Sequence, residues 1–164
     1  MLGVINDILD FSKIEAGRLE LDHRPFELRE AIGDTLKSLS LRANDDQIEL
    51  ACHISADVPE FLVGDSGRLR QIVVNLVANA IKFTDQGEIL LDVAIDEDTD
   101  DQSLMNWPAA AANPDAPIRL HVSVTDTGIG ISEGKLQRIF EAFEQADTSM
   151  TRRYEGTGLG LAIT

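Results

Sequence analysis

Residues 68–84 read RLRQIVVNLVANAIKFT and carry both a helical apolar pattern and a row of polar side chains. Asn75, Asn79 and Lys82 fall within about 60° of one another on a helix that turns about 100° per residue. Amide oxygens are hard ligands suited to Mg²⁺, and a lysine ammonium suits phosphate. The alternative is a polar face turned to water, which is favoured if this helix is considered alone. The predicted apolar face lies on a neighbouring arc and comprises Leu69, Ile72, Leu76 and Ala80.

The segments on either side of this helix alternate between apolar and polar residues, which is typical of half-buried strands. One predicted strand precedes the helix at 48–54, and two follow it at 89–95 and 118–124. Asp65 or Ser66 is placed to cap the helix N-terminus, because a short oxygen-bearing side chain can accept from the first free backbone N–H groups. The sequence therefore predicts strands interleaved with a capped helix.

The first 47 residues predict more helix than strand. The predicted elements are a helix at 2–16, a short strand at 18–22, a second helix from 26 to about 43 and a turn at 44–47. Gly17 is placed to end the first helix, and Pro25 interrupts the strand. Together the elements predict an α+β fold: a two-layer sandwich with helices on one face of a mixed, mostly antiparallel sheet, preceded by an N-terminal helix.

Composition limits what the chain can bind. The formal net charge of −15 argues against nucleic acid, and it disfavours an anionic ligand unless Mg²⁺ and a few basic side chains offset the field. Cys52 is the single cysteine, which excludes an intramolecular disulfide. There is no membrane-spanning apolar run and no signal-peptide pattern, so a cytoplasmic location is expected, with a membrane anchor left open for a longer parent protein. Residues 96–117 are acidic and then low in complexity, and we interpret them as a loop insertion.

Asp126 follows the last alternating strand and shares the parity of its apolar residues, which predicts a carboxylate directed at the buried face. Such a carboxylate needs a partner, and the exocyclic amine of adenine supplies N–H donors. The alternative is an aspartate that caps its own turn, with Gly128 and Gly130 serving backbone geometry alone. Nothing in this segment by itself chooses between the two.

Four motifs in order resemble sensor histidine kinases, especially the hybrid type. Residues 68–84 resemble the N box, 126–131 the first glycine box, 140–145 the F box, and 156–161 the second glycine box. Residues 6–17 resemble the end of the second dimerisation helix. The resemblance implies the Bergerat ATP-binding fold, which Hsp90, gyrase B and MutL share, with ATP and Mg²⁺ as ligands.

The resemblance also implies roles for the polar row. Asn79 would coordinate Mg²⁺, Asn75 would support the site one turn earlier, and Lys82 would contact phosphate. ATP-hydrolysing relatives use a glutamate at the place of Asn75, whereas an amide cannot act as a general base. This favours transfer of the γ-phosphoryl group to a protein over hydrolysis.

At the other end of the nucleotide, Asp126 would accept from the adenine amine while Gly128 and Gly130 shape the turn. The remaining implied binding residues are Phe83 beside the nucleotide, Phe143 at the start of a lid, Arg152 or Arg153 as a lid cation, and Gly156, Thr157, Gly158, Leu159 and Gly160 along the triphosphate.

One departure concerns the phosphate acceptor. The family's acceptor histidine precedes an acidic residue, and none of His23, His53 and His121 does so. The acceptor is expected upstream of Met1, both ends look cut, and the chain divides into a helix end at 1–17 and a C-terminally truncated catalytic domain at 18–164. A further departure is Glu155, where many relatives have glycine.

The partners expected from the resemblance are a histidine-bearing dimerisation domain, a response regulator receiver domain and, in the parent protein, a second copy. Three alternatives stay open. They are a nucleotide-binding regulatory module without transfer activity, a serine kinase of the same fold, and a truncated fragment that cannot bind ATP.

Overall fold

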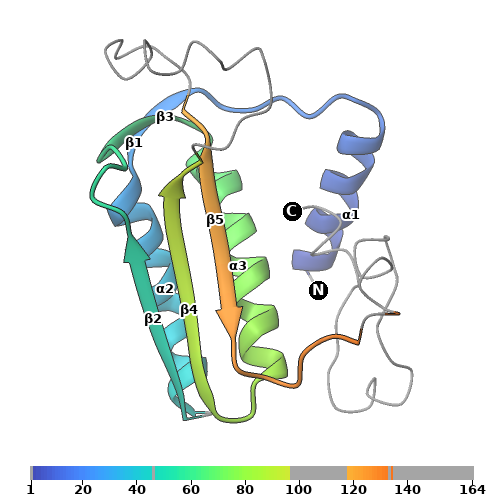
Figure 1. Ribbon diagram of the computed structural model, residues 1–164. Coiled ribbons are helices and arrows are strands. Elements are labelled where there is room, and N and C mark those ends of the chain that lie inside the picture. Colours follow the sequence, from blue (N-terminus) through green and yellow to red (C-terminus); the bar gives the residue numbers. More distant parts are fainter. Residues whose placement is uncertain (1, 46, 97–117, 133, 135–164) are drawn as a thin grey trace.

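The computed structural model describes residues 2–45, 47–96, 118–132 and 134. Within them the chain forms α1 (Leu2–Glu15), β1 (Arg24–Glu27), α2 (Leu28–Asp45), β2 (Ile48–Ile54), β3 (Phe61–Gly64), α3 (Ser66–Phe83), β4 (Gly87–Ile95) and β5 (Leu120–Asp126), as Figure 1 shows. The predicted N-terminal helix, the central helix and the three alternating strands are confirmed.

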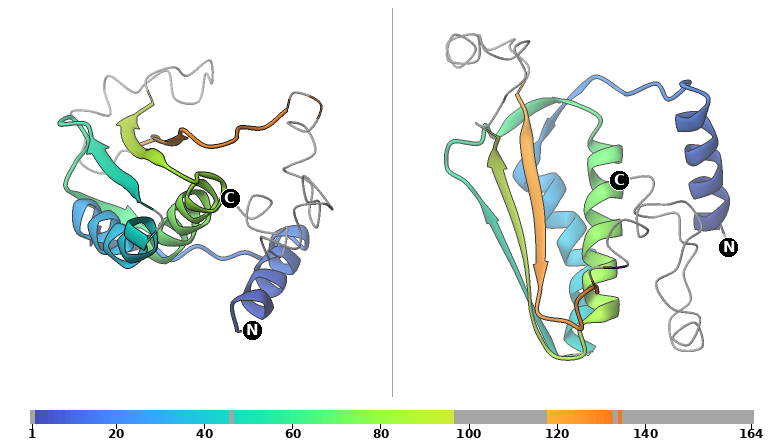
Figure 2. Two further views of the ribbon diagram at one scale, coloured as in Figure 1. Left: turned by 90° about the horizontal axis from the view of Figure 1, so that it is seen from below. Right: turned by 45° about the vertical axis from the view of Figure 1, so that its right-hand side comes forward.

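The main sheet has three strands in the order β2-β4-β5 among the described residues. β2 runs parallel to β4, and β4 runs antiparallel to β5, so the sheet is mixed. Helices α2 and α3 lie side by side on one face of it (Figure 2). This is the predicted two-layer α+β arrangement.

The core lies between the sheet and the two helices. Ile89, Leu91 and Val93 alternate along the central strand β4 and are 0% exposed, as are Val73 and Val77 on α3. Each buried aliphatic side chain of this size contributes about 1.5–3 kcal/mol. This packing fixes α3 against the sheet and makes it a rigid support for the polar side chains that it carries.

The helix predicted from 26 to about 43 is present as α2, but the strand and the turn predicted on either side of it need correction. Residues 18–22 form no strand; the strand is β1, which contains Pro25 and pairs with β3, a strand missed in the sequence. Proline is tolerated here because β1 lies at the edge of a two-stranded sheet. The predicted turn at 44–47 is helix up to Asp45, and Gln47 takes the turn's left-handed conformation with φ of 57°.

The buried face of α3 also differs from the predicted one. Its buried residues are Val73, Val77, Ala80 and Ile81. Helical geometry places the centre of this face roughly opposite Asn75, Asn79 and Lys82, rather than on the neighbouring arc. The polar row therefore lies on the side of α3 that faces away from the sheet.

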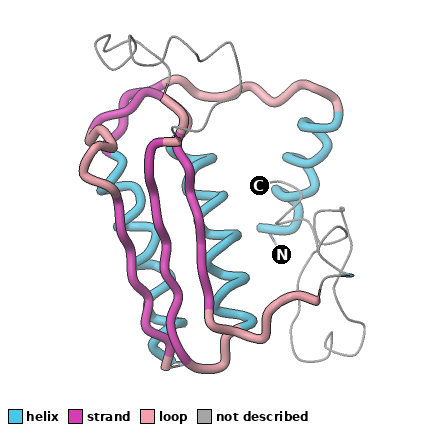
Figure 3. The backbone as a smooth tube through the Cα atoms, viewed as in Figure 1, coloured by secondary structure: helices cyan, strands magenta, loops and turns pink. Residues whose placement is uncertain are grey.

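Helix α1 lies outside the two-layer sandwich. Figures 1 and 2 show it beside α3, on the side away from the sheet, and Figure 3 shows the loop that joins it to β1. In the described part of the chain, none of the helices combines the length and apolar character needed to cross a membrane. Most of the predicted loop insertion and the two later motifs, at 140–145 and 156–161, lie outside the described residues.

Candidate functional site

Helix α3 carries the polar row, and two features hold the helix in place: a capped N-terminus and a face that is buried against the sheet. The Asp65 side chain caps the helix: its Oδ1 accepts from the backbone N of Arg68 at 2.9 Å, which confirms Asp65 as one of the two predicted caps. Asn75, Asn79 and Lys82 are all partly buried. The row thus has little freedom to move relative to the sheet.

Lys82 lies at the last turn of α3. Burial lowers the pKa of its ammonium below the ordinary lysine value. Its Nζ lies 5.1 Å from the centroid of the Phe83 ring, a distance typical of a cation–π contact. A partly desolvated ammonium gains more from a nearby anion than an exposed one does, so this position suits a phosphate.

The turn after β5 begins at Asp126, whose Oδ1 accepts from the backbone N of Gly128 at 2.9 Å. Its parity is as predicted, because it pairs with the buried Ile89. The prediction of a buried carboxylate is wrong: Asp126 is exposed, since it is the last residue of its strand. It caps its own turn, as the alternative stated, yet a carboxylate has further lone pairs for a second donor.

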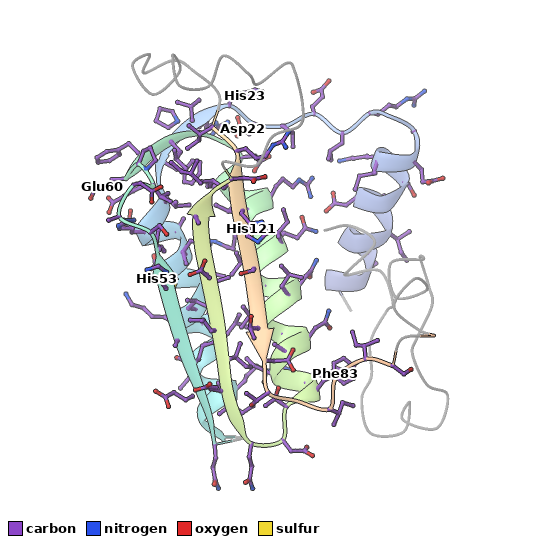
Figure 4. The ribbon with its side chains drawn as sticks, in the orientation of Figure 1. Asp22, His23, His53, Glu60, Phe83 and His121 are labelled. Atoms are coloured by element: carbon purple, nitrogen blue, oxygen red, sulfur yellow. The ribbon has the colours of Figure 1, made fainter. Side chains whose placement is uncertain are left out.

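This turn is packed on the end of α3. A Cβ atom added to Gly128 would lie 2.2 Å from the carbonyl oxygen of Phe83, so only glycine fits. Ile129 donates its backbone N–H to the same oxygen at 3.1 Å. Figure 4 shows Phe83 at this end of α3, next to the turn. The contact brings the helix that carries Asn79 and the turn that carries Asp126 to one place.

A second attachment of the turn was missed in the sequence. The hydroxyl of Thr127 accepts from the backbone N of Glu88 at 3.1 Å, and the backbone N of Thr127 donates to the carbonyl of Glu88 at 3.2 Å. Gly87 permits this approach: its φ is 127°, and a Cβ there would lie 2.1 Å from the Thr127 hydroxyl. The only signal available in the sequence was the glycine at the start of the predicted strand.

Gly130 has a φ of 66°, in the left-handed region that glycine favours. The turn therefore bends sharply right after its contact with α3.

Thr84, the residue that ends α3, is 3% exposed, and its hydroxyl has no hydrogen-bond partner among the described residues. That hydroxyl oxygen lies 2.8 Å from the position of a Cβ on Gly128, inside the same contact.

The described residues bring together only part of the predicted set. Asn75, Asn79, Lys82 and Phe83 share α3, and Asp126, Gly128 and Gly130 share the adjoining turn. The other predicted residues lie outside the described part and are Phe143, Arg152, Arg153, Gly156, Thr157, Gly158, Leu159 and Gly160.

The chemistry of this set fits a metal held by one amide oxygen together with oxygens of a bound ligand. Within the described ranges there is no group of three or more His, Cys, Asp and Glu side chains able to hold a metal ion. His53 and His121 are exposed, and the Nδ1 atom of His53 lies 2.6 Å from Oδ1 of Asp92.

Comparison with known proteins gives the family. The family described as "Histidine kinase-, DNA gyrase B-, and HSP90-like ATPase" matches residues 64–164. The sensor histidine kinase GacS of Pseudomonas protegens is 46% identical over all 164 residues, and the signal transduction histidine-protein kinase BarA of Escherichia coli K12 is 44% identical over the same length. The chain spans 16% of each of these two relatives.

Solved structures agree. Full-length ShkA in complex with AMPPNP has a TM-score of 0.73 and 34% identity, covering 99% of this chain and 29% of that one. The nucleotide-free catalytic domain of the histidine kinase ThkA has a TM-score of 0.60 and 25% identity, covering 87% of this chain and 76% of that one. With these matches and with a turn packed on the end of a helix bearing the N-box residues, the chain belongs to the family of histidine kinase-, DNA gyrase B- and HSP90-like ATPases.

Proposed function

We propose that the chain is the ATP-binding catalytic part of a hybrid sensor histidine kinase. It transfers the γ-phosphoryl group of ATP to a histidine outside this chain, for relay to a response regulator receiver domain. Residues 1–17 are the end of a dimerisation helix, and residues 18–164 are the catalytic domain, with an insertion at 96–117. The family match and the 46% identity to GacS support this assignment.

One observation carries the site assignment: the contact between Gly128 and the Phe83 carbonyl. Because of it, a single nucleotide can reach Asn79 and Lys82 on α3 and Asp126 on the turn. In the proposed arrangement, Lys82 binds phosphate, Asp126 accepts from the adenine amine, and Asn79 holds Mg²⁺. The ion neutralises phosphate charge when bound.

Asn75 supports transfer rather than hydrolysis. It lies one turn before Asn79 on α3, where it could reach a water molecule near the phosphates. An amide cannot take a proton from that water, so the site lacks a general base at this position. Phosphoryl transfer to a positioned acceptor needs little beyond alignment and charge neutralisation.

The lid and the triphosphate contacts are also proposals. Phe143 begins the lid, Arg152 or Arg153 supplies a lid cation, and the segment from Gly156 to Gly160 lines the triphosphate with backbone N–H groups.

The partners follow from the same assignment. In α1, Ile5, Ile8 and Leu9 are exposed, which supports a homodimer formed through this helix in the longer protein. Sedimentation of that protein at low micromolar concentration tests the dimer, and a monomer there would exclude it.

Calorimetry with MgADP tests the site. Asn79→Ala should weaken MgADP binding by about ten- to a hundredfold, the loss expected for one bond to a charged group, and the effect should shrink when Mg²⁺ is chelated. Asp126→Asn should weaken ADP binding more than GDP binding. The asparagine side chain carries an N–H donor of its own, which cannot accept from the adenine amine.

Two matched variants control for surface changes near the site. Gln86→Ala removes an exposed amide just after α3, and Asp85→Asn neutralises an exposed aspartate beside it. Both should bind MgADP like the unaltered chain. Equal affinity in all five proteins would reject the site, and nucleotide binding without phosphorylation of an added histidine-bearing dimerisation domain would favour the regulatory alternative.

A further inference from the structure

A set of polar contacts joins α1 to the first turns of α3. The Arg68 guanidinium donates through Nη1 to Oδ2 of Asp10 at 2.5 Å and through Nη2 to Oδ1 at 2.9 Å. Gln71 adds a bond from Nε2 to Oδ2 of Asp10 at 3.1 Å. A planar guanidinium matched to both oxygens of one carboxylate fixes distance and direction together.

These contacts are partly shielded from water. The side chain of Asp10 is 13% exposed and that of Arg68 is 30% exposed. The hydrogen bond from Arg68 is the main cause that lowers the pKa of the Asp10 carboxyl, and the bond to Asp10 in turn raises the pKa of Arg68. Arg68 is also held in place by Gln71, whose Oε1 accepts from Nη1 at 2.7 Å. Exposed ion pairs contribute little, but this one is bidentate, partly desolvated and supported by a neighbour.

The same turn of α3 holds the loop that leaves α1. Oδ2 of Asp65 accepts from the backbone N of Asp22 at 3.1 Å, while its Oδ1 caps α3. The start of α3 therefore holds α1 at Asp10 and the following loop at Asp22. Two attachments separated along the chain restrict the orientation of α1 more than one could.

Arg68 lies on the same side of α3 as the proposed nucleotide residues. Helical geometry places Arg68, Asn75, Asn79 and Lys82 within a sector of about 60°, with roughly 16 Å along the axis from Arg68 to Asn79. The opposite side of α3 is buried against the sheet. One straight helix thus carries a contact to α1 at its start and the nucleotide residues at its end.

We propose that Asp10, Arg68 and Gln71 position the dimerisation helix, and the acceptor histidine joined to it, relative to the nucleotide held at the far end of α3. The inference rests on the proposed kinase function. These are positioning residues, because they are proposed to act through the placement of α1 and not by contact with the reacting atoms. Transfer requires the acceptor nitrogen in line with the γ-phosphorus, and a displacement of about 1 Å can slow such a reaction about a hundredfold.

The test uses the longer protein that includes the acceptor histidine. Arg68→Gln and Asp10→Asn should each lower the initial rate of histidine phosphorylation at saturating ATP by at least about tenfold. The KM for ATP and the affinity for MgADP should change less than about twofold, because the nucleotide residues keep their support on the sheet. The double variant Asp10→Arg with Arg68→Asp should recover a substantial part of the rate, since it restores the pair with its charges exchanged.

Two matched variants serve as controls. Arg70→Gln removes an exposed arginine two residues along α3, and Glu15→Gln removes an exposed carboxylate on α1. Both should phosphorylate at the unaltered rate, and a thermal melt of every variant identifies any that fails to fold.

The outcomes separate the two proposals. An unaltered protein that binds MgATP but phosphorylates no histidine would contradict the kinase function. An active unaltered protein whose Arg68 and Asp10 variants phosphorylate normally would overturn the positioning role. Nucleotide affinity that falls as much as the rate, or no recovery in a folded exchanged pair, would overturn it as well.

Discussion

At Gly128, the absence of one atom, the Cβ, permits a contact between two elements. Its missing Cβ lets the turn after β5 lie against the Phe83 carbonyl, and Ile129 then bonds to that oxygen. Residue type and spacing left a solvent-facing or turn-capping alternative open for Asn79, Lys82 and Asp126, and their proposed roles come from the resemblance to sensor histidine kinases. The sequence could not predict the contacts of Gly128 and Gly87, because these depend on which backbone atoms of distant segments come together.

Gly128→Ala tests this contact. The added methyl group would overlap a backbone oxygen that cannot rotate away, so the free energy of unfolding should fall by about 1–3 kcal/mol, and MgADP binding should weaken with it. Urea denaturation and calorimetry measure the two effects.

Gly33→Ala is the matched control. Gly33 lies inside α2 with no atom within 4 Å of an added Cβ, so alanine should raise the free energy of unfolding by about 0.5–1 kcal/mol. A Gly128→Ala variant as stable as this control would show that the turn does not pack on α3 as described.

Helix α3 carries both the proposed nucleotide residues and the contact to α1. Its start was predictable because Asp65 is a strong capping residue at the head of a periodic segment. Its buried face was not, because apolar residues such as Ile72 and Leu76 flank the polar row and blur the pattern. Burial against β4 and α2, which is tertiary information, decided the face.

Asp65→Ala should lower the free energy of unfolding by about 1 kcal/mol, because α3 loses its cap and the loop after α1 loses a bond. Asp65→Asn is the control and should retain most of the stability, since asparagine caps about as well. Chemical denaturation compares the three proteins, and equal stability in the alanine variant would contradict the capping role.

The same residue gives a pH dependence. Backbone N–H groups of Arg68 and Asp22 lower the pKa of Asp65 below the ordinary aspartate value of about 3.9. Its contribution to stability is therefore present above that value and disappears as the pH falls through the lowered native pKa. As the pH is lowered below about 4, the free energy of unfolding should therefore fall less in Asp65→Ala than in the unaltered chain, as urea denaturation at each pH would measure.

The whole molecule combines a helix, α1, with a sandwich that is the ATPase family's fold. The sequence predicted this division and the layer arrangement, because alternating strands and amphipathic helices have distinct periods. It did not predict the contact of Asp10 with Arg68, which joins two segments whose local patterns are independent of each other. Substitutions at Asp10 or Arg68 can therefore alter the position of α1 relative to the sandwich.

In the proposed site, α3 and the turn after β5 bind one nucleotide. The most direct measurement is an NMR titration of the chain with MgADP, which follows the side-chain amide of Asn79 and the backbone amides of Gly128 and Gly130. If one nucleotide contacts both elements, all three signals should shift with a single Kd. Shifts confined to one element, or two different Kd values, would contradict this site.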